Sequence, residues 1–362
     1  MKARVIAFYL PQFHPIPEND KWWGKGFTEW TNVGKAKALF QGHYQPHVPA
    51  DLGYYDLRVP EIRVAQAEMA KKYGIEGFMY WHYWFGNGKR LLERPFSEVL
   101  KSGSPDFPFA LAWANESWKG FAHGLKNRNV LIEQSYPGEK DYIEHFYAVL
   151  PAFKDKRYLT VEGKPIFMIY KPELLPNPDN FICLWNRLAV KNGLKGICFV
   201  AHVNHFEKNE TEECIVSRMI NYGFSLVNIV RLYQPSKKRS LIRKFRNKIE
   251  RTLLNMPLCI PYKEAYSYFI SEIDKSEEVI PTLIPNWDHT PRSGRHGLVL
   301  TGSTPDLFRK HTKDIMSIIV EKKDERRIVF VKSWNEWAEG NYLEPDLKWG
   351  TRYLDVLRQE LK

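Results

Sequence analysis

The sequence predicts an α/β protein in which residues 1–362 form a (β/α)8 barrel, and three observations support this prediction. Short apolar segments rich in β-branched residues, which suit buried parallel strands, alternate with segments of helical periodicity. Eight such strand segments can be recognised, the number that closes this type of barrel. Polar and aromatic residues follow directly after them, at the end where barrel enzymes place their sites. A doubly wound sheet is the alternative, but no G-x-G-x-x-G follows an early strand.

The predicted elements alternate along the whole chain. Pro60 and Gly74 mark the beginning and end of the first clear helix. Residues 10–58 instead form a long excursion rich in loops, and a stretch of this length without regular structure is typical of an active-site loop. The predicted strands are 4–9, 77–81, 109–113, 165–170, 196–202, 225–230, 279–284 and 328–333, and the predicted helices are 61–73, 96–101, 141–153, 181–191 and 305–321.

Composition indicates a globular protein, with 44% apolar and 26% charged residues. Aromatic residues reach 14%, a content that suits either a large core or the stacking of sugars. The four cysteines show no C-x-x-C spacing and are expected to be reduced core residues. The apolar run 5–10 is too short for a signal peptide or a membrane span, so we expect a cytoplasmic protein.

The net charge of +11 is concentrated in one segment. Residues 231–252 hold nine Lys and Arg but only one acid, within a predicted insertion at about 231–275. Apolar residues recur at helical spacing between 240 and 254, which is typical of a basic helix lying on an anionic membrane, here the inner membrane. A helix packed on the barrel fits the pattern equally well. Nucleic-acid binding is not predicted, because no motif that reads nucleic acid accompanies the charge.

A pair of glutamates lies near the end of the chain, in the segment 328–340. A β-branched run, 328–331, is followed by Glu336 and Glu339, which are flanked by Trp334 and Trp337. Along a continuing strand the two carboxylates would point to opposite faces, so we expect the chain to leave strand geometry at Asn335 or Glu336. Paired carboxyls among aromatic rings suit glycosidic chemistry, in which one acts as an acid and the other as a base or nucleophile.

Other polar residues also follow predicted strands and would meet at the same rim of the barrel. They are His14, His82, Asn115, Glu116, Tyr170, His202, Asp288, Glu336 and Glu339. His14, His43, His47 and His82 lack the spacing of a metal site, and hydrogen-bonding roles are expected for them. No metal or other cofactor is predicted.

Several blocks of sequence resemble the WbsX family, a group of bacterial proteins from polysaccharide gene clusters that are described as glycosyltransferases. That family is in turn similar to the family 99 glycoside hydrolases, the endo-α-mannosidases. The blocks are YLPQFHP (9–15), GFTEWTNV (26–33), DLGYYD (51–56), HYWF (82–85), WANE (113–116), Trp287 and Asp288 with Arg292, and WNEWAEG (334–340) followed by LEPD (343–346).

The resemblance implies a retaining mechanism with a 1,2-anhydro sugar. Glu336 would deprotonate the sugar 2-hydroxyl, and Glu339, with its pKa raised by its neighbour and by apolar walls, would act as acid and then base. Asn335 would bond a sugar hydroxyl, and the rings of Trp81, Trp84 and Trp113 would stack on sugars. The substrate-binding residues implied in all are Tyr9, His14, Trp30, Trp81, His82, Trp84, Trp113, Asn115, Glu116, Tyr170, His202, Trp287, Asp288, Arg292, Asn335 and Trp337.

The leading expectation is therefore an enzyme that cleaves or forms α-glycosidic bonds in bacterial surface polysaccharides, with an oligosaccharide or polysaccharide as its substrate, lipid-linked substrates included. One alternative is glycosyl transfer in the synthesis of O-antigen, capsule or lipopolysaccharide. A second alternative is a barrel that binds glycans without catalysis.

Overall fold

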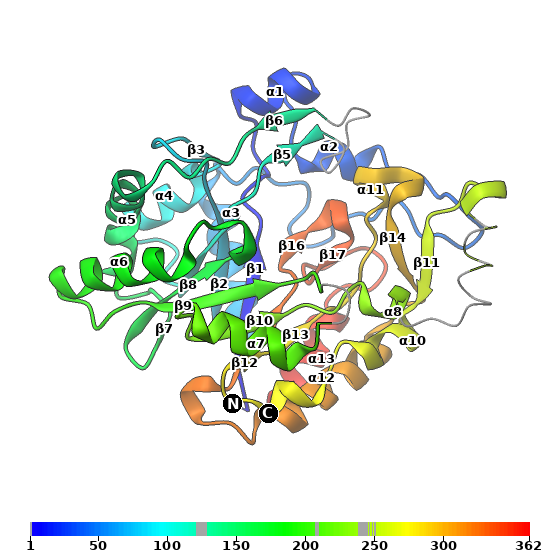
Figure 1. The fold of residues 1–362 in the computed structure, drawn as a ribbon. Coiled ribbons are helices and arrows are strands. Elements are labelled where there is room, and N and C mark those ends of the chain that lie inside the picture. Colours follow the sequence, from blue (N-terminus) through cyan, green and yellow to red (C-terminus); the bar gives the residue numbers. More distant parts are fainter. Residues whose placement is uncertain are drawn as a thin grey trace.

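The computed structural model describes residues 2–120, 129–206, 210–237, 245, 247, 249 and 251–362. Its main sheet is a ring of parallel strands at the centre of the molecule (Figure 1). The strands, in the order in which they pair, are β1 (Arg4–Tyr9), β2 (Gly77–Trp84), β4 (Phe109–Trp113), β8 (Lys164–Ile169), β9 (Cys198–Val203), β10 (Leu226–Ile229), β12 (Val279–Ile280) with β13 (Thr282–Leu283), and β15 (Ile328–Val331).

The ring closes through the seventh strand position. β12 pairs with β10 and β13 pairs with β15, while only Pro281 separates β12 from β13. The Pro281 carbonyl accepts a hydrogen bond from Phe330 N at 3.1 Å. Since β15 also pairs with β1, the eight positions form a nearly closed barrel. The predicted fold is confirmed.

Helices cover the outside of the ring (Figure 1). Two of them, α7 and α13, were not predicted. The helices are α3 (Pro60–Lys72), α4 (Arg94–Ser102), α5 (Glu139–Phe153), α6 (Pro178–Lys191), α7 (Glu212–Asn221), α12 (Pro305–Ile319) and α13 (Arg352–Glu360). Both chain ends lie together at the foot of the barrel, where Lys2 N donates to the Leu361 carbonyl.

Strand alternation decides which side chains enter the barrel. Phe8 and Trp81 point inward and stack with ring centroids 4.9 Å apart, and Phe330 packs on Phe8 from β15. Their neighbours in sequence, Tyr9 and His82, point outward into the layer between the strands and the helices. The barrel interior is therefore filled with aromatic rings below its C-terminal rim.

The excursion 10–58 lies over this rim and holds two short helices, α1 (Pro17–Trp23) and α2 (Glu29–Gly34). The Thr28 side chain caps α2 by accepting from Trp30 N at 3.3 Å, which fixes where the helix begins. The excursion returns to its own beginning, because Leu57 N donates to the Phe13 carbonyl. It thus forms one wall of the barrel mouth.

A smaller apolar cluster lies beside the barrel, between β10 and β15 in sequence. Its framework is the parallel pair β11 (Leu258–Pro261) and β14 (Leu298–Thr301), with α10 (Tyr262–Ala265) and α11 (Thr290–Ser293). The cluster includes Val230, Ile260, Tyr262, Phe269, Trp287 and Leu300. The remaining short strands and helix are β3 (Arg90–Leu91), β5 (Trp118–Lys119), β6 (Val130–Ile132), β7 (Thr160–Val161), α8 (Gln234–Lys237), β16 (Asn335–Glu336) and β17 (Asn341–Tyr342).

The basic segment 231–252 is described only in part. Arg231 does not belong to its surface, because the buried guanidinium pairs with Glu212 at 2.7 Å and Asp274 at 2.8 Å. Residues 245, 247, 249 and 251–253 are helical, whereas 238–244, 246, 248 and 250, including Leu241 and Ile242 of the predicted apolar stripe, lie outside the described residues. Within the described part of the chain, no helix is both long and apolar enough to cross a bilayer.

The cysteine prediction was right in one respect and wrong in another. None of the four cysteines, all of which lie in the described part of the chain, forms a disulfide. Cys198 is buried in β9, but Cys183 and Cys214 are exposed on helices, so these two are not core residues.

Asn335 joins the first and last strands of the barrel, and its replacement tests that joint. The Asn335 side chain accepts from Leu10 N at 2.7 Å and donates to the Leu10 carbonyl at 3.0 Å. We expect Asn335→Ala to lower the free energy of unfolding by about 2–4 kcal/mol, because two buried backbone groups lose their partner. Asn192→Ala, which removes a bond within a partly exposed helix end, should cost about 0.5 kcal/mol or less. Chemical denaturation measures both; equal, small losses would contradict this assignment.

Candidate active site

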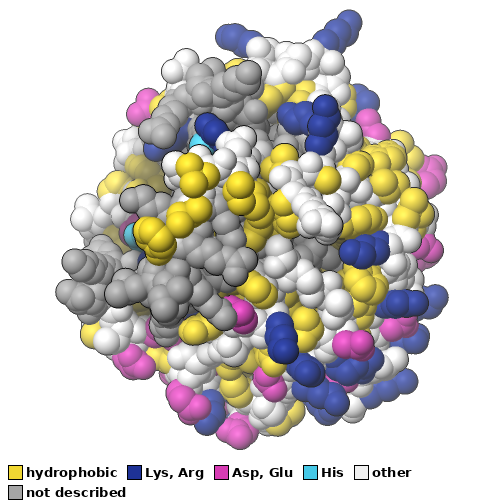
Figure 2. All heavy atoms as spheres, turned by 90° about the vertical axis from the view of Figure 1, so that its right-hand side faces the viewer, with side chains coloured by type: hydrophobic (Ala, Val, Ile, Leu, Met, Phe, Trp, Pro, Cys, Tyr) yellow, Lys and Arg dark blue, Asp and Glu magenta, His cyan; other side chains and the backbone are white. Residues whose placement is uncertain are grey.

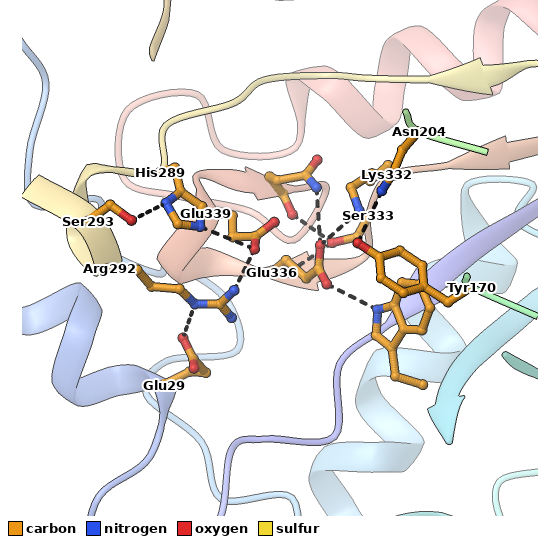
Figure 3. Close-up of polar contacts among 12 residues, drawn as sticks. Glu29, Tyr170, Asn204, His289, Arg292, Ser293, Lys332, Ser333, Glu336 and Glu339 are labelled. Carbon is orange, nitrogen blue, oxygen red and sulfur yellow. Dashed lines mark hydrogen bonds and ion pairs between the residues drawn. The ribbon is translucent and has the colours of Figure 1, made fainter. Parts of the chain in front are cut away.

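A hairpin after β15 brings the paired glutamates together at the rim of the barrel (Figure 3). β16 pairs with β17 in antiparallel fashion, and a 3₁₀ turn over Trp337–Glu339 joins them. Gly340 closes the turn with φ of 55°, and a Cβ there would lie 2.7 Å from the Asp288 Cβ. β15 ends at Val331 and Asn335–Glu336 form a separate strand, so the chain leaves strand geometry before the predicted Asn335 and again after Glu336, and both acids face one site.

Glu336 is the deeper acid, with 5% of its surface exposed. Its Oε1 accepts from Trp81 Nε1 at 3.0 Å, and its Oε2 accepts from Asn341 Nδ2 at 3.2 Å. The Lys332 ammonium lies 3.9 Å from Oε2. These donors hold the carboxyl at a fixed angle, facing the barrel axis.

Glu339 lies nearer the rim and contacts two side chains of another loop, Arg292 and His289. Arg292 Nη1 lies 2.5 Å from Glu339 Oε1, and His289 Nε2 lies 3.6 Å from the same oxygen. Arg292 also donates through Nε to Glu29 Oε2 at 3.1 Å. Glu29, on α2, thereby ties the N-terminal excursion to the hairpin that carries the paired acids through one arginine (Figure 3).

The two carboxyls have opposite electrostatic surroundings. Burial raises the pKa of Glu336, and the charge of Glu339 adds to this, although Lys332 opposes both. Burial alone would also raise the pKa of Glu339, but Arg292 and His289 outweigh it and hold that pKa well below the usual range. The expectation that Glu339 has the raised pKa is wrong, since the sequence gave no sign that Arg292 would lie against it.

Lys332 is a buried cation that the sequence reasoning missed. Its ammonium is surrounded by the rings of Phe8, Trp81 and Trp287, at 5.9, 5.8 and 5.5 Å from the centroids. Strand alternation places Lys332 on the same inward face of β15 as Phe330, and this signal was available in the sequence. The charge of Lys332 offsets part of the cost of burying Glu336.

Two side chains of neighbouring strands complete the pocket beside Trp81. The Tyr170 ring packs edge-on against Trp81 at 5.2 Å, and its hydroxyl accepts from Asn204 Nδ2 at 3.1 Å. His202 lies 5.0 Å from the Tyr170 ring, and its Nδ1 donates to Asn228 Oδ1 at 2.8 Å, because the Asn228 amide nitrogen is occupied by Ile280 and Thr282. His202 Nε2 is then a bare acceptor, and among the described residues it has no partner.

Glu116 and Trp287 lie at the edge of this group. Burial raises the pKa of Glu116, against the nearby Lys171 and Lys332. Trp287 faces Lys332, and its buried Nε1 has no hydrogen-bond partner within the described part of the chain. The predicted residues that the structure gathers around the paired acids are Trp81, Glu116, Tyr170, His202, Trp287, Arg292, Glu336 and Glu339.

Another group of predicted residues braces the loops instead of facing the pocket. Both oxygens of Asp288 are occupied, by His43, Gln45 and Thr290. The Asn335 amide is committed to Leu10, so it is not open to a sugar hydroxyl. Bonds within the protein also hold His14 (Pro11), Trp30 (Tyr55), Asn115 (Tyr136 and Lys171) and Trp337 (Glu344).

Four predicted residues lie outside the barrel, between the strands and the helices. His82 Nε2 meets His145 Nε2 of α5 at 2.8 Å, and Trp84 donates to Asp141 on the same helix. Trp113 packs on Phe181 of α6, and Tyr9 bonds Gln66 of α3. The prediction placed Tyr9, His82, Trp84 and Trp113 in the pocket because it ignored strand alternation.

Comparisons with known proteins identify the family. The profile of the family described as Glycosyltransferase WbsX matches residues 5–357. The chain belongs to this family. The WbsX chain is also 35% identical over 370 residues to two curated relatives, both described as Uncharacterized protein WxcX, from two strains of Xanthomonas campestris pv. campestris. The alignment covers 100% of this chain but 50% of each relative, so the chain spans about half the length of these proteins.

Solved structures support the fold. An endo-α-mannosidase of glycoside hydrolase family 99 from Bacteroides thetaiotaomicron matches with a TM-score of 0.59 and 14% identity, covering 100% of this chain and 96% of that one. A protein described as glycoside hydrolase-like matches with a TM-score of 0.57 and 16% identity, covering 99% and 94%. The WbsX chain is thus a member of a carbohydrate-active family and has the barrel fold of these hydrolases.

Glu344, which braces the hairpin, should make stability depend on pH. It accepts from Tyr55, Gln66 and Trp337, yet burial raises its pKa from 4.5 to about 7. The folded state therefore binds this proton more tightly than the unfolded state. The resulting stabilisation is complete below pH 4.5 and is lost as the pH rises through about 7.

Between these limits we expect the wild type to lose about 3 kcal/mol of unfolding free energy relative to Glu344→Gln. Denaturant melts across the pH range give the two slopes. Glu139→Gln, at an exposed position, is the control and should keep the wild-type slope. Parallel curves for wild type and Glu344→Gln would show that Glu344 does not titrate in this range.

Arg292 should determine the charge state of Glu339. We expect Arg292→Met to raise the pKa of Glu339 toward or above the ordinary glutamate value, because its closest cation is gone. Arg292→Lys keeps the charge and should leave the pKa low. Arg295→Met, at an exposed position three residues on, is the matched control. Carboxyl ¹³C NMR titration measures each, and an unchanged Glu339 titration in Arg292→Met would contradict this role.

Proposed function

We propose that this protein cleaves or forms an α-glycosidic bond in an oligosaccharide, with Glu336 and Glu339 as its catalytic pair. The observation that carries the proposal is the placement of two neighbouring, largely buried carboxyls at the C-terminal rim of the barrel, each with its own donors. Burying two acids side by side costs free energy, and such a pair in a cleft is therefore a candidate for a functional site. Trp81 and Tyr170 supply aromatic surface beside Glu336, as sugar binding requires.

The reaction we propose retains the anomeric configuration. Glu336 removes the proton of the sugar 2-hydroxyl, and that oxygen attacks the anomeric carbon to form a 1,2-anhydro sugar while Glu339 protonates the departing oxygen. In the second half, Glu339 removes a proton from an incoming water or sugar hydroxyl, which opens the anhydro ring at the anomeric carbon. Glu336 then returns its proton to the 2-oxygen.

The charges of the free protein require an additional step in this scheme. Glu339 must be protonated to act as the acid, yet Arg292 holds it ionised. We propose that the bound sugar separates Arg292 from Glu339, while Glu29 retains the arginine. The order of the two pKa values favours a second assignment, in which Glu336 is the acid and Glu339 the base.

Substrates with different leaving groups separate these assignments. The probes are a fluoride of an α-linked mannosyl disaccharide, which needs no acid, and the corresponding trisaccharide, which does. Under the first assignment, Glu339→Gln should lose turnover of the trisaccharide by about 10²–10⁴-fold but still release fluoride in the first turnover, because only the opening of the anhydro ring then lacks its base, while Glu336→Gln should lose both reactions. The reverse pattern would exchange the roles. Asn204→Ala, which alters a partner of Tyr170, is a control that should retain part of both activities.

Calorimetry of the same variants with the trisaccharide tests catalysis against simple binding. A catalytic pair predicts that both Gln variants keep sugar affinity while turnover falls. If the wild type binds the sugar without turning it over, the protein is a glycan-binding barrel and the proposal fails.

The biological substrate we propose is an oligosaccharide of a bacterial surface polysaccharide, such as a lipid-linked precursor of O-antigen, capsule or lipopolysaccharide. The family description favours transfer to a sugar hydroxyl, whereas the fold it shares with an endo-α-mannosidase favours hydrolysis. The ratio of transfer to hydrolysis products in the presence of a free sugar acceptor distinguishes the two.

A further inference from the structure

Large apolar side chains of the basic segment are exposed. Residues 245, 247, 249 and 251–253 are helical, and a spacing of four places Phe245, Ile249 and Leu253 on one side of a helix. Their exposed fractions are 65%, 39% and 76%, and the neighbouring Leu254 is 63% exposed. An exposed stripe of this kind marks a binding surface, because scattered apolar residues on a protein surface do not line up in this way.

The same stretch carries most of the positive charge of the protein. With the buried Arg231 set aside, residues 237–251 contain eight Lys and Arg and a single acid, Glu250, whereas the whole chain has a net charge of +11. Cations that lie close in sequence to an apolar stripe suit a partner that offers apolar depth and a negative surface together.

A cavity of about 570 Å³ adjoins the stripe. Its cationic lining comes from Arg251 and Arg295, and Thr252 and Asn247 add polar groups. Figure 2 looks onto the side of the molecule that bears β11 and β14, and hydrophobic side chains gather there close to the residues drawn in grey. The helical segment therefore presents Phe245, Ile249 and Leu253 on one side, and Asn247 and Arg251, which line the cavity, on the other.

We propose that this face, defined by Phe245, Ile249, Leu253 and Leu254 with Arg251 and Arg295, docks on an anionic lipid surface. The apolar side chains enter the boundary between headgroups and acyl chains, and the exposed cations Arg251 and Arg295 attract the lipid phosphates. Repulsion between like charges disfavours a second copy of the chain as the partner. Nucleic acid binds mainly through its phosphates, so it would leave the apolar side chains exposed. The proposal goes beyond the glycosidic chemistry and is independent of it, because no residue of this face contacts the paired acids.

Vesicle sedimentation with the full chain tests the proposal. We expect the wild type to sediment with vesicles of phosphatidylcholine and phosphatidylglycerol, to remain in solution with phosphatidylcholine alone, and to be released by salt. Phe245→Ser/Ile249→Ser/Leu253→Ser should lower the partition coefficient at least about tenfold, since each exposed side chain would lose its burial in lipid. Val190→Ser, which alters a 63% exposed apolar residue on α6, is the matched control and should bind as the wild type does.

Charge and alternative partners are tested with the same proteins. Arg251→Glu/Arg295→Glu should weaken binding to anionic vesicles while sugar affinity and turnover stay unchanged. The proposal is overturned if the triple serine variant still sediments fully, or if neutral vesicles bind equally well. It is also overturned if the wild type ignores both vesicles but forms dimers, or binds duplex DNA, through the substituted residues.

Discussion

The need to compensate buried negative charge organises the mouth of this barrel. A carboxylate removed from water costs several kcal/mol unless donors replace the water, and the acids of this mouth are largely or fully buried: Glu29, Asp288, Glu336, Glu339, Glu344 and Asp346. The donors come from parts of the chain that are distant in sequence. The N-terminal excursion contributes Tyr55 to Glu344, His43 and Gln45 to Asp288, and Glu29 to the arginine that pairs with Glu339. The hydrogen bonds that compensate these buried acids therefore also hold the excursion on the barrel. A change in the charge of one of these acids would alter the contacts that position the excursion.

The fold could be predicted because each strand carries its own signal. β-branched apolar runs and the turns that follow them are local features, and all eight strand positions were found within a few residues of their observed bounds. Strand alternation, which is also a local feature, would have improved the prediction of the site residues. Trp81 and His82 are neighbours in β2 and face opposite sides, so a residue that follows a strand signal is a site candidate only when its alternation points inward. Tyr9, Trp84 and Trp113 fail that test, and Lys332 passes it.

What the sequence could not supply was the pairing of charges between loops. Nothing local relates Arg292 to Glu339 or Glu29, which are separated from it by 47 and 263 positions. The carboxyl with the raised pKa was therefore misassigned, although the pair itself was recognised. Asn335 illustrates the same limit, because an amide beside a catalytic acid looks like a sugar ligand until Leu10 is seen to occupy it.

The two faces of interest are joined by a short structural path. The basic segment runs directly into β11, which pairs with β14, and β14 follows the turn that carries Arg292. An isolated bridge between Asp288 and Val299, together with the bond from Asp288 N to the Glu339 carbonyl at 2.7 Å, connects β14 to the hairpin that carries the paired acids. If the lipid surface fixes the position of β11, it also fixes the distance of Arg292 and the hairpin from that surface. For a substrate anchored in the same surface, this arrangement would limit how far along a glycan chain the paired acids can act.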